Sequence, residues 1–202
     1  MSHLTEEDVK AILNPYHGTL RQLVCSAYEE FVFYKASRAE RAKSPVRYPR
    51  TIANFVFDEI ANLASSEFTL DKDVAIFEQP QTIKLLVQGQ VIIRFKKGDS
   101  EGLGRNVMTQ AEMDFIDPQQ SLPGLPKEAE KVEITWKPNV LGTEISSVSV
   151  VSRSGSHSNW SYEIPEEESG RDFNIVPIPP HNPSNNPPLV SVKNPNKTAS
   201  SE

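Results

Sequence analysis

The chain has 202 residues, of which 37% are hydrophobic, and its formal net charge is −6. This length suits one domain, or one domain followed by a long tail, and a folded part of about 160 residues buries about 70% of its unfolded surface. The single cysteine, Cys25, excludes an internal disulfide, and its apolar neighbours indicate a buried structural thiol. No apolar run approaches the roughly 18 residues of a membrane span, and the acidic N-terminus is unlike a secretory signal. We therefore expect a cytoplasmic protein without a membrane partner.

Three segments before residue 69 have the apolar periodicity of amphipathic helices. We expect the first over residues 5–13, where the hydroxyl of Thr5 caps the helix and acidic residues follow it. The second is expected over residues 15–43, because apolar side chains recur there at spacings of three and four before Pro45 ends the pattern. The third is expected over residues 49–65, and together the two longer helices predict a helical hairpin or an orthogonal pair.

After residue 68 the pattern changes to short runs typical of β-strands. The step Gln88-Gly89 separates two of these runs and predicts a tight hairpin turn. Strands are expected over residues 74–77, 82–87, 90–95, 132–136, 145–151 and 160–164. This order predicts an α+β domain in which two or three N-terminal helices pack on a mostly antiparallel sheet of about five to six strands. The domain is expected over residues 1–164, with a helical part over 1–68 and a sheet part over 69–164.

A long connection over residues 97–126 interrupts the series of strands. It is expected to contain one short helix over residues 109–115, because Thr109 and Glu112 have the spacing of a capping box. The stiff sequence Leu-Pro-Gly-Leu-Pro over residues 122–126 predicts a turn in which Gly124 takes a positive φ and the flanking leucines lie under the sheet.

The last segment, residues 165–202, has a different composition. Eight prolines fall between Pro165 and Pro195, interleaved with asparagine and serine, and apolar residues are few. Such a segment cannot bury enough surface to offset its chain entropy, so we expect a disordered tail. Residues 175–180 either form a short docking peptide for a partner or belong to an inert tail.

The end of the third strand is the first candidate site. Alternation along the strand places Arg94 and Lys96 on one face and Phe95 and Lys97 on the other. A functional interpretation is an anion site, because arginine forks and loop amides suit phosphate oxygens. The alternative is an edge strand that lysines protect against pairing. The candidate binding residues are Arg94, Lys96, Lys97, Arg105 and Asn106.

A second candidate surface lies at the end of the second helix, where six basic residues and one acid occur between residues 35 and 50. The basic residues are Lys35, Arg38, Arg41, Lys43, Arg47 and Arg50. Tyr34 and Tyr48 accompany them, and basic clusters with aromatic rings bind nucleic acid through phosphate contacts and base stacking. The alternatives are a solvated helix end and a surface that meets an acidic partner.

Catalytic and metal-binding motifs are absent from the sequence. Glu133 lies on a strand, but no lysine follows it at the spacing of a metal-dependent nuclease, and the four histidines are scattered without a zinc motif. The glycines after the third strand do not end in the Gly-Lys-Ser/Thr of a phosphate loop. We therefore assign no catalytic residue, no metal site and no cofactor.

The order of motifs from residue 74 to 164 resembles a poorly characterised bacterial and phage family. The resemblance rests on Ile93 to Lys97, Arg105-Asn106, Thr109, Phe115, Gln119 or Gln120, residues 122–126 and a strand near Trp136. Members resemble products encoded beside Xre-type regulators fused to zinc-peptidase-like domains, an arrangement similar to a toxin–antitoxin or phage-defence pair. Many members have Gly-Tyr where this chain has Thr135-Trp136, and the resemblance implies no catalytic role for any residue.

Three hypotheses follow. The first is a cytosolic, toxin-like effector that acts by binding and is held in check by a protein partner, the neighbour-encoded regulator. The second is a nucleic-acid-binding accessory protein that uses the basic residues between 35 and 50 together with those between 94 and 105. The third is a protein-interaction module that recruits a partner through its proline-rich tail.

Overall fold

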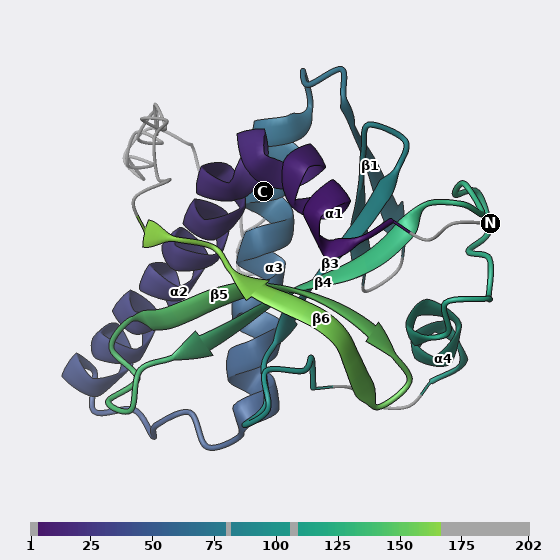
Figure 1. Cartoon of the computed structure of the whole chain (residues 1–202). Coiled ribbons are helices and arrows are strands. Elements are labelled where there is room, and N and C mark those ends of the chain that lie inside the picture. The colour runs from purple at the N-terminus through teal and green to yellow at the C-terminus, as the bar shows by residue number, and fades with distance from the viewer. Residues whose placement is uncertain (1–3, 80–81, 106–108, 167–202) are drawn as a thin grey trace, which may run out of the picture. The chain divides into compact units, whose positions relative to one another are not determined.

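The computed structural model describes residues 4–79, 82–105 and 109–166 (Figure 1). These residues belong to one unit, Met1–Arg171, and the second unit, Asp172–Glu202, lies outside the described residues, as does the predicted tail from residue 167 onward. Within the described ranges, no helix is long and apolar enough to cross a membrane. The predicted α+β class is confirmed, with three N-terminal helices followed by a six-stranded sheet.

The three N-terminal helices form where predicted, with bounds that differ by a few residues for the second and third. α1 (Glu6–Leu13) has a full capping box, since the Thr5 hydroxyl accepts from the Asp8 amide at 3.3 Å and the Asp8 carboxylate accepts from the Thr5 amide at 2.9 Å. A 3₁₀ turn, η1 (Asn14–Tyr16), separates it from α2 (His17–Glu40), which is shorter at both ends than predicted. α3 (Pro49–Phe68) starts on a proline, as expected, and continues past residue 65.

The sheet has the strand order β1-β2-β3-β4-β5-β6. Its strands are β1 (Val74–Gln79), β2 (Thr82–Val87), β3 (Val91–Lys97), β4 (Glu130–Pro138), β5 (Ile145–Ser154) and β6 (His157–Glu163). All neighbours are antiparallel except β3 and β4, which are parallel. Parallel neighbours need a crossover connection, and the chain between them contains α4 (Gln110–Ile116).

Two predicted turns form as expected. Gln88 and Gly89 have φ angles of 50° and 69°, and the Gln90 amide donates to the Val87 carbonyl at 2.9 Å, which is the tight hairpin that suits twisted strands. Gly124 has a φ of 79°, and Leu122 is buried against the sheet beneath it. The second turn therefore fixes the crossover connection to the sheet.

Alternating residues send the sheet's side chains into two apolar clusters. Ile93, Phe95 and Trp136 belong to the larger cluster, which the sheet shares with α1, α2 and α3. Ile92 lies on the opposite face and packs with Phe115 of α4 in a smaller cluster. Figure 1 shows α4 at the right of the sheet, apart from α2 and α3 at the left. The half-buried Cys25 packs against the larger cluster, and burial raises the pKa of its thiol.

Candidate functional site

The alternation of β3 divides the predicted binding residues between two environments. Arg94 and Lys96 lie on the face that α4 covers, whereas Lys97 follows Phe95 on the helical face. Arg94 is only 6% exposed. The expectation that Arg94 lies on an exposed cationic surface is therefore wrong, because the crossover connection covers this part of the strand.

Arg94 is instead the centre of a buried ion cluster. Its Nη1 donates to Glu112 of α4 at 2.7 Å, its Nε donates to Glu133 of β4 at 3.1 Å, and its Nη2 donates to both carboxylates. The guanidinium also lies 3.8 Å from the centroid of the Phe115 ring. Arg94 thus joins β3, β4 and α4, and its charge is neutralised inside the protein.

Glu133 holds the loop that follows β3 onto this cluster. Its carboxylate is fully buried and accepts from the Gly104 amide at 3.1 Å and from Arg153 at 3.5 Å. The approach at Gly104 is close, because a Cβ there would lie 2.6 Å from Glu133 Oε2 and 2.8 Å from Lys96 Cβ. Only glycine therefore allows the loop to contact the carboxylate.

Lys96 belongs to the same cluster. Its Nζ lies 3.4 Å from the Glu112 carboxylate, and its side chain is 30% exposed. Burial is the main cause that lowers the pKa of Lys96, followed by the Arg94 charge, while Glu112 acts in the opposite direction. Lys96 is thus a partly buried cation that already has a carboxylate partner.

Lys97 and Arg105 are brought together in a different environment. The strand-end loop, residues 97–105, folds back on itself through a bridge between Gly98 and Gly104, and the Arg105 amide donates to the Lys97 carbonyl at 2.9 Å. Burial, and after it the nearby Arg105 charge, lowers the pKa of Lys97. Within the described residues, neither side chain has a carboxylate partner. Asn106, the last predicted binding residue, lies outside the described residues.

The acidic residue nearest to this pair in the loop has a structural role. The Asp99 carboxylate accepts from the amides of Glu101 and Leu103 at 2.9 and 3.0 Å, so it closes the turn of the strand-end loop. Lys137 Nζ donates to the Ser100 carbonyl at 3.2 Å from the neighbouring strand. The loop is thus held by Glu133, Asp99 and Lys137, while Lys97 and Arg105 have no carboxylate partner among the described residues.

The basic residues of the second candidate surface divide in a similar way. Lys35 donates to the Gly142 carbonyl at 3.1 Å, and Arg38 donates to the Ser44 carbonyl at 2.7 and 3.1 Å, so these two hold the local structure. The other four are exposed and have no ion pair among the described residues. These four are Arg41, Lys43, Arg47 and Arg50.

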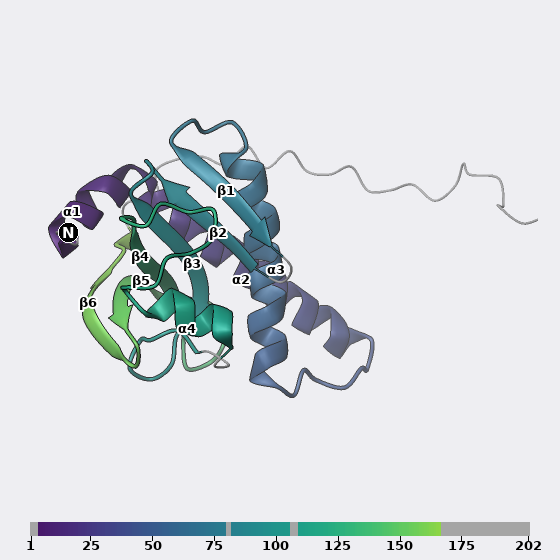
Figure 2. The same cartoon turned by 90° about the vertical axis from the view of Figure 1, so that its right-hand side faces the viewer.

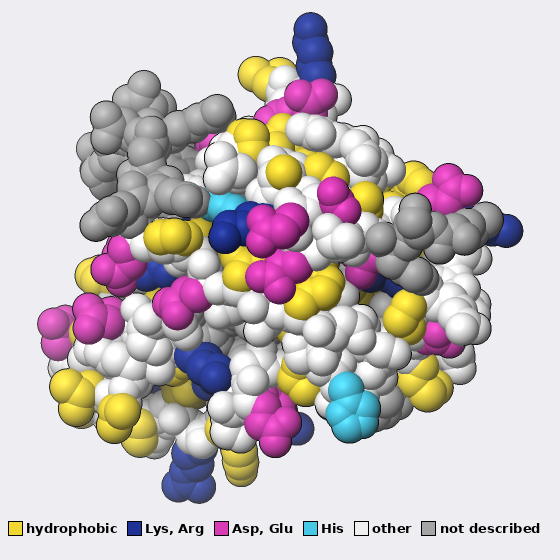
Figure 3. All heavy atoms as spheres, viewed as in Figure 1, with side chains coloured by type: hydrophobic (Ala, Val, Ile, Leu, Met, Phe, Trp, Pro, Cys, Tyr) yellow, Lys and Arg dark blue, Asp and Glu magenta, His cyan; other side chains and the backbone are white. Residues whose placement is uncertain are grey.

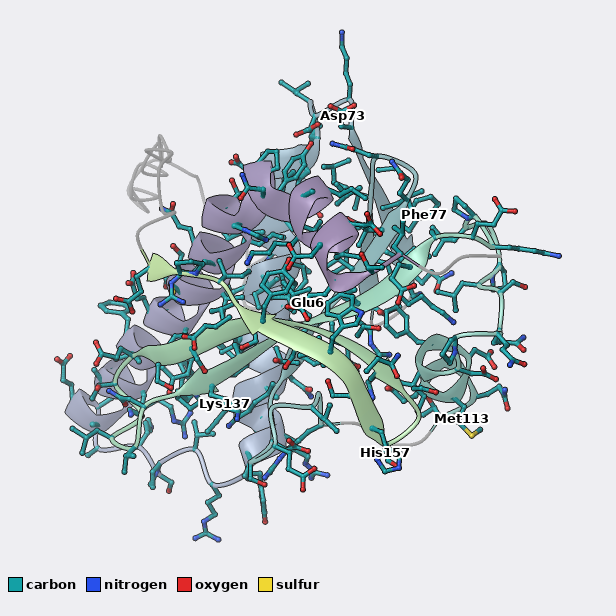
Figure 4. The ribbon with its side chains drawn as sticks, in the orientation of Figure 1. Glu6, Asp73, Phe77, Met113, Lys137 and His157 are labelled. Atoms are coloured by element: carbon teal, nitrogen blue, oxygen red, sulfur yellow. The ribbon has the colours of Figure 1, made fainter. Side chains whose placement is uncertain are left out.

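The two basic segments lie at the same end of the described unit. β3 ends and α3 begins at the lower end of Figures 1 and 2, where the α2–α3 connection also lies. We name this region the basic end and define it by its cations that have no carboxylate partner in the part of the chain that the structure describes, which are Arg41, Lys43, Arg47, Arg50, Lys97 and Arg105. Figure 4 shows Lys137 at this end and Asp73 at the opposite end. In Figure 3 a Lys or Arg side chain forms the lowest projection, and Asp and Glu side chains are spread over the face.

The basic end contrasts with the rest of an acidic chain. The net charge is −6, yet residues 35–50 carry six basic residues and one acid. The N-terminus of α3 adds the positive end of a helix dipole to the same region. Such separation of charge produces a local positive potential that total charge does not reveal.

Outside the basic end, the described residues contain a hollow with cationic side chains and no candidate metal cluster. No group of three or more His, Cys, Asp or Glu side chains there is placed to hold a metal. A hollow of about 620 Å³ beside α4 is lined by Lys131 and Arg153 among others. Lys131 already donates to the carbonyls of Asp114 and Gln120, and Arg153 donates to those of Gly104 and Gly155. The cations of this hollow therefore stabilise the surrounding loops.

Comparison of the chain with protein-family models, with curated proteins and with solved structures finds no match. The site is thus defined by geometry alone. Sequence reasoning missed the Arg94–Glu133 pair, although a signal was present. Arg94 and Glu133 each lie in the middle of an apolar strand, where a buried charge needs a partner on a neighbouring strand.

Proposed function

We propose that this protein binds nucleic acid through its basic end. The observation that carries the proposal is the Lys97–Arg105 pair, in which two cations lie together without a carboxylate partner in the described residues. Like charges at short distance destabilise a fold, so an external anion would relieve the repulsion. Four further exposed cations lie at the same end of the unit.

A polyanion fits this surface better than a single small anion. The cations are distributed over the strand-end loop and the α2–α3 connection, and the hollow beside α4 is lined by other residues. A nucleic-acid backbone presents a regular series of phosphates that contacts such a surface at several points and releases condensed counterions. The protein would act by binding, since cations spread over an open surface suit contact with a phosphate backbone.

The test is the salt dependence of binding to a labelled oligonucleotide, measured by fluorescence anisotropy. We expect the affinity to fall steeply as salt rises, and the double substitution Arg47→Ala/Lys97→Ala to reduce the slope of log K against log salt by about 2. Lys72→Ala/Lys127→Ala is the charge-matched control, because both lysines are exposed and lie outside the basic end. Absence of salt-dependent binding would contradict the proposal.

A toxin-like effector held in check by a protein partner is the second candidate function. Exposed apolar residues next to the basic end favour a protein contact there. Val140 and Leu141, in the β4–β5 turn, are exposed, and the adjacent Gly142 accepts a hydrogen bond from Lys35. In a cytoplasmic two-gene pair, the partner would cover this turn and block access to the basic end.

Ectopic expression tests this second candidate. The wild-type chain is expected to slow growth without the neighbouring regulator, and co-expression of the regulator is expected to restore growth. Lys97→Ala/Arg105→Ala is the comparison variant, because it removes the half-buried Lys97 and the exposed Arg105 from the basic end and leaves the buried Arg94 cluster intact. Normal growth with the wild-type chain alone would contradict the effector function.

A further inference from the structure

We infer that the basic end prefers single-stranded nucleic acid to duplex, and that Tyr48 stacks on an unpaired base. This inference rests on the function proposed above. Tyr48 lies in the α2–α3 connection, immediately before α3, and is 58% exposed. A large aromatic ring so exposed within a basic surface is the feature that single-stranded binding sites use.

The position of Tyr48 is fixed before any ligand binds. Tyr48 precedes Pro49, and a residue before proline is held in an extended conformation, which agrees with its φ of −105° and ψ of 130°. Its carbonyl accepts from the Thr51 amide at 3.0 Å in the first turn of α3. The ring is therefore carried by a backbone with little freedom, which reduces the entropy lost on binding.

The ring has one cationic neighbour and ample access to solvent. The Arg50 guanidinium lies 5.4 Å from the ring centroid of Tyr48. Because Tyr48 is also 58% exposed, the ring keeps surface on which a base can stack. Arg50, with no carboxylate partner among the described residues, is placed to contact the phosphate of the same nucleotide.

Tyr34 lies near the same end of the unit, but unlike Tyr48 its ring packs against other parts of the protein. It stacks on Phe55 with ring centroids 5.2 Å apart and an interplanar angle of 22°, and its hydroxyl accepts from Arg38 at 3.1 Å. Arg38 lies 5.6 Å from the same centroid. Tyr34 thus packs α2 on α3, whereas the ring of Tyr48 has Arg50 as its one neighbouring cation or ring among the described residues.

The preference for single-stranded nucleic acid over duplex follows from how accessible the bases are in each. In a duplex the base faces are stacked on one another and are not accessible to a protein ring, so Tyr48 would contribute little to duplex binding. In a single strand each base offers a face, and stacking is tolerant of sequence. The preference would therefore extend to DNA and RNA alike.

The test uses fluorescence anisotropy with the full chain and four labelled ligands of about 20 nucleotides, oligo(dT), oligo(rU), a blunt DNA duplex and a blunt RNA duplex. We expect single strands to bind at least about tenfold more tightly than duplexes. Tyr48→Ala is expected to weaken single-strand binding about tenfold and to leave duplex binding unchanged. Tyr48→Phe, which keeps the ring, is expected to bind as the wild type does.

The outcomes separate this inference from the function on which it rests. Equal binding of strands and duplexes with no effect of Tyr48→Ala would overturn the inference and leave nucleic-acid binding intact. Absence of binding to all four ligands would remove both. A preference for single strands that Tyr48→Ala leaves unchanged would also overturn the assignment of Tyr48. Thermal unfolding of each variant controls for folding, which an exposed side chain should not affect.

Discussion

The Arg105 amide donates to the Lys97 carbonyl at 2.9 Å, and this bond holds two cationic residues opposite each other at the end of β3. Burial, and after it the nearby Arg105 charge, lowers the pKa of Lys97, so the charged form of Lys97 is disfavoured in the folded protein. Unfavourable placement of a charge in a loop of the native protein is typical of a binding surface.

Substitution of Arg105 should affect binding and stability in opposite directions. Arg105→Gln removes the repulsion with Lys97, so we expect the free protein to be slightly more stable at low salt, by up to about 0.5 kcal/mol. The same change should weaken oligonucleotide binding, because one phosphate contact is lost. Urea unfolding and anisotropy measured on the same preparation check both signs. A loss of both stability and binding would indicate that Arg105 mainly supports the fold.

The Lys97 charge should make stability depend on pH in the alkaline range. The folded state lowers the pKa of Lys97, so the charged form destabilises the fold at neutral pH, and this effect is lost as pH rises through the lowered pKa toward about 10.4. We expect Lys97→Met to be more stable than the wild type near neutral pH and its advantage to shrink as pH rises. Urea midpoints over this range measure the difference, and an advantage independent of pH would contradict the expectation.

The Arg94 cluster should be essential for stability and have no direct role in binding. Arg94→Met leaves the buried carboxylates of Glu112 and Glu133 without their main cation, and loss of one partner from a buried ion pair costs about 3–5 kcal/mol. Arg94→Lys should recover only part of this loss, because lysine cannot donate to both carboxylates with the same geometry. Urea unfolding measures the free energy, and Lys72→Ala is the exposed control.

Binding by the Arg94 variants then distinguishes structure from function. Under conditions where Arg94→Lys remains folded, we expect its affinity for oligonucleotides to equal that of the wild type, because the guanidinium is buried. A large loss of affinity in the folded variant would assign Arg94 to the ligand site.

Gly104 should be a sensitive position of the strand-end loop. In Gly104→Ala, the added Cβ would lie within 3.0 Å of Glu133 Oε2 and of Lys96 Cβ, so the loop must move away from the buried carboxylate. We expect a loss of about 1–3 kcal/mol, as for other overpacked sites. Ser100→Ala, in the exposed turn of the same loop, is the matched control. Equal unfolding midpoints for the two variants would show that the loop adapts without cost.

Much of the fold was predictable because local patterns agree with the final structure. The Thr5 cap, the apolar stripe of the second helix and the Gln88-Gly89 turn all depend on nearby residues, and each forms as expected. The prediction of a short helix in the crossover was right, and Thr109 caps it, but the Glu112 carboxylate bonds Arg94 instead of completing a capping box. Long-range charge pairing overrides the local preference at that point.

The candidate site was predictable in part. The sequence indicated two basic segments, and strand alternation indicated that Lys97 lies on the other face from Lys96, but nothing indicated that Arg94 pairs with an acid 39 positions away. That pairing depends on the parallel register of β3 and β4, which brings Arg94 opposite Glu133. The register between two strands that a long connection separates is set by the packing of the whole domain. Local sequence patterns therefore do not predict it.

The parallel contact between β3 and β4 has a consequence for how the chain folds. It divides the sheet into two three-stranded meanders, β1 to β3 and β4 to β6, each built from neighbours in sequence. Meanders of this kind assemble through short loop closures, whereas the seam between them must close the loop from Lys97 to Glu130. We expect the seam to form last during refolding. In pulse-labelled hydrogen exchange, the backbone amides of β5 should therefore become protected earlier than the amides that join β3 to β4.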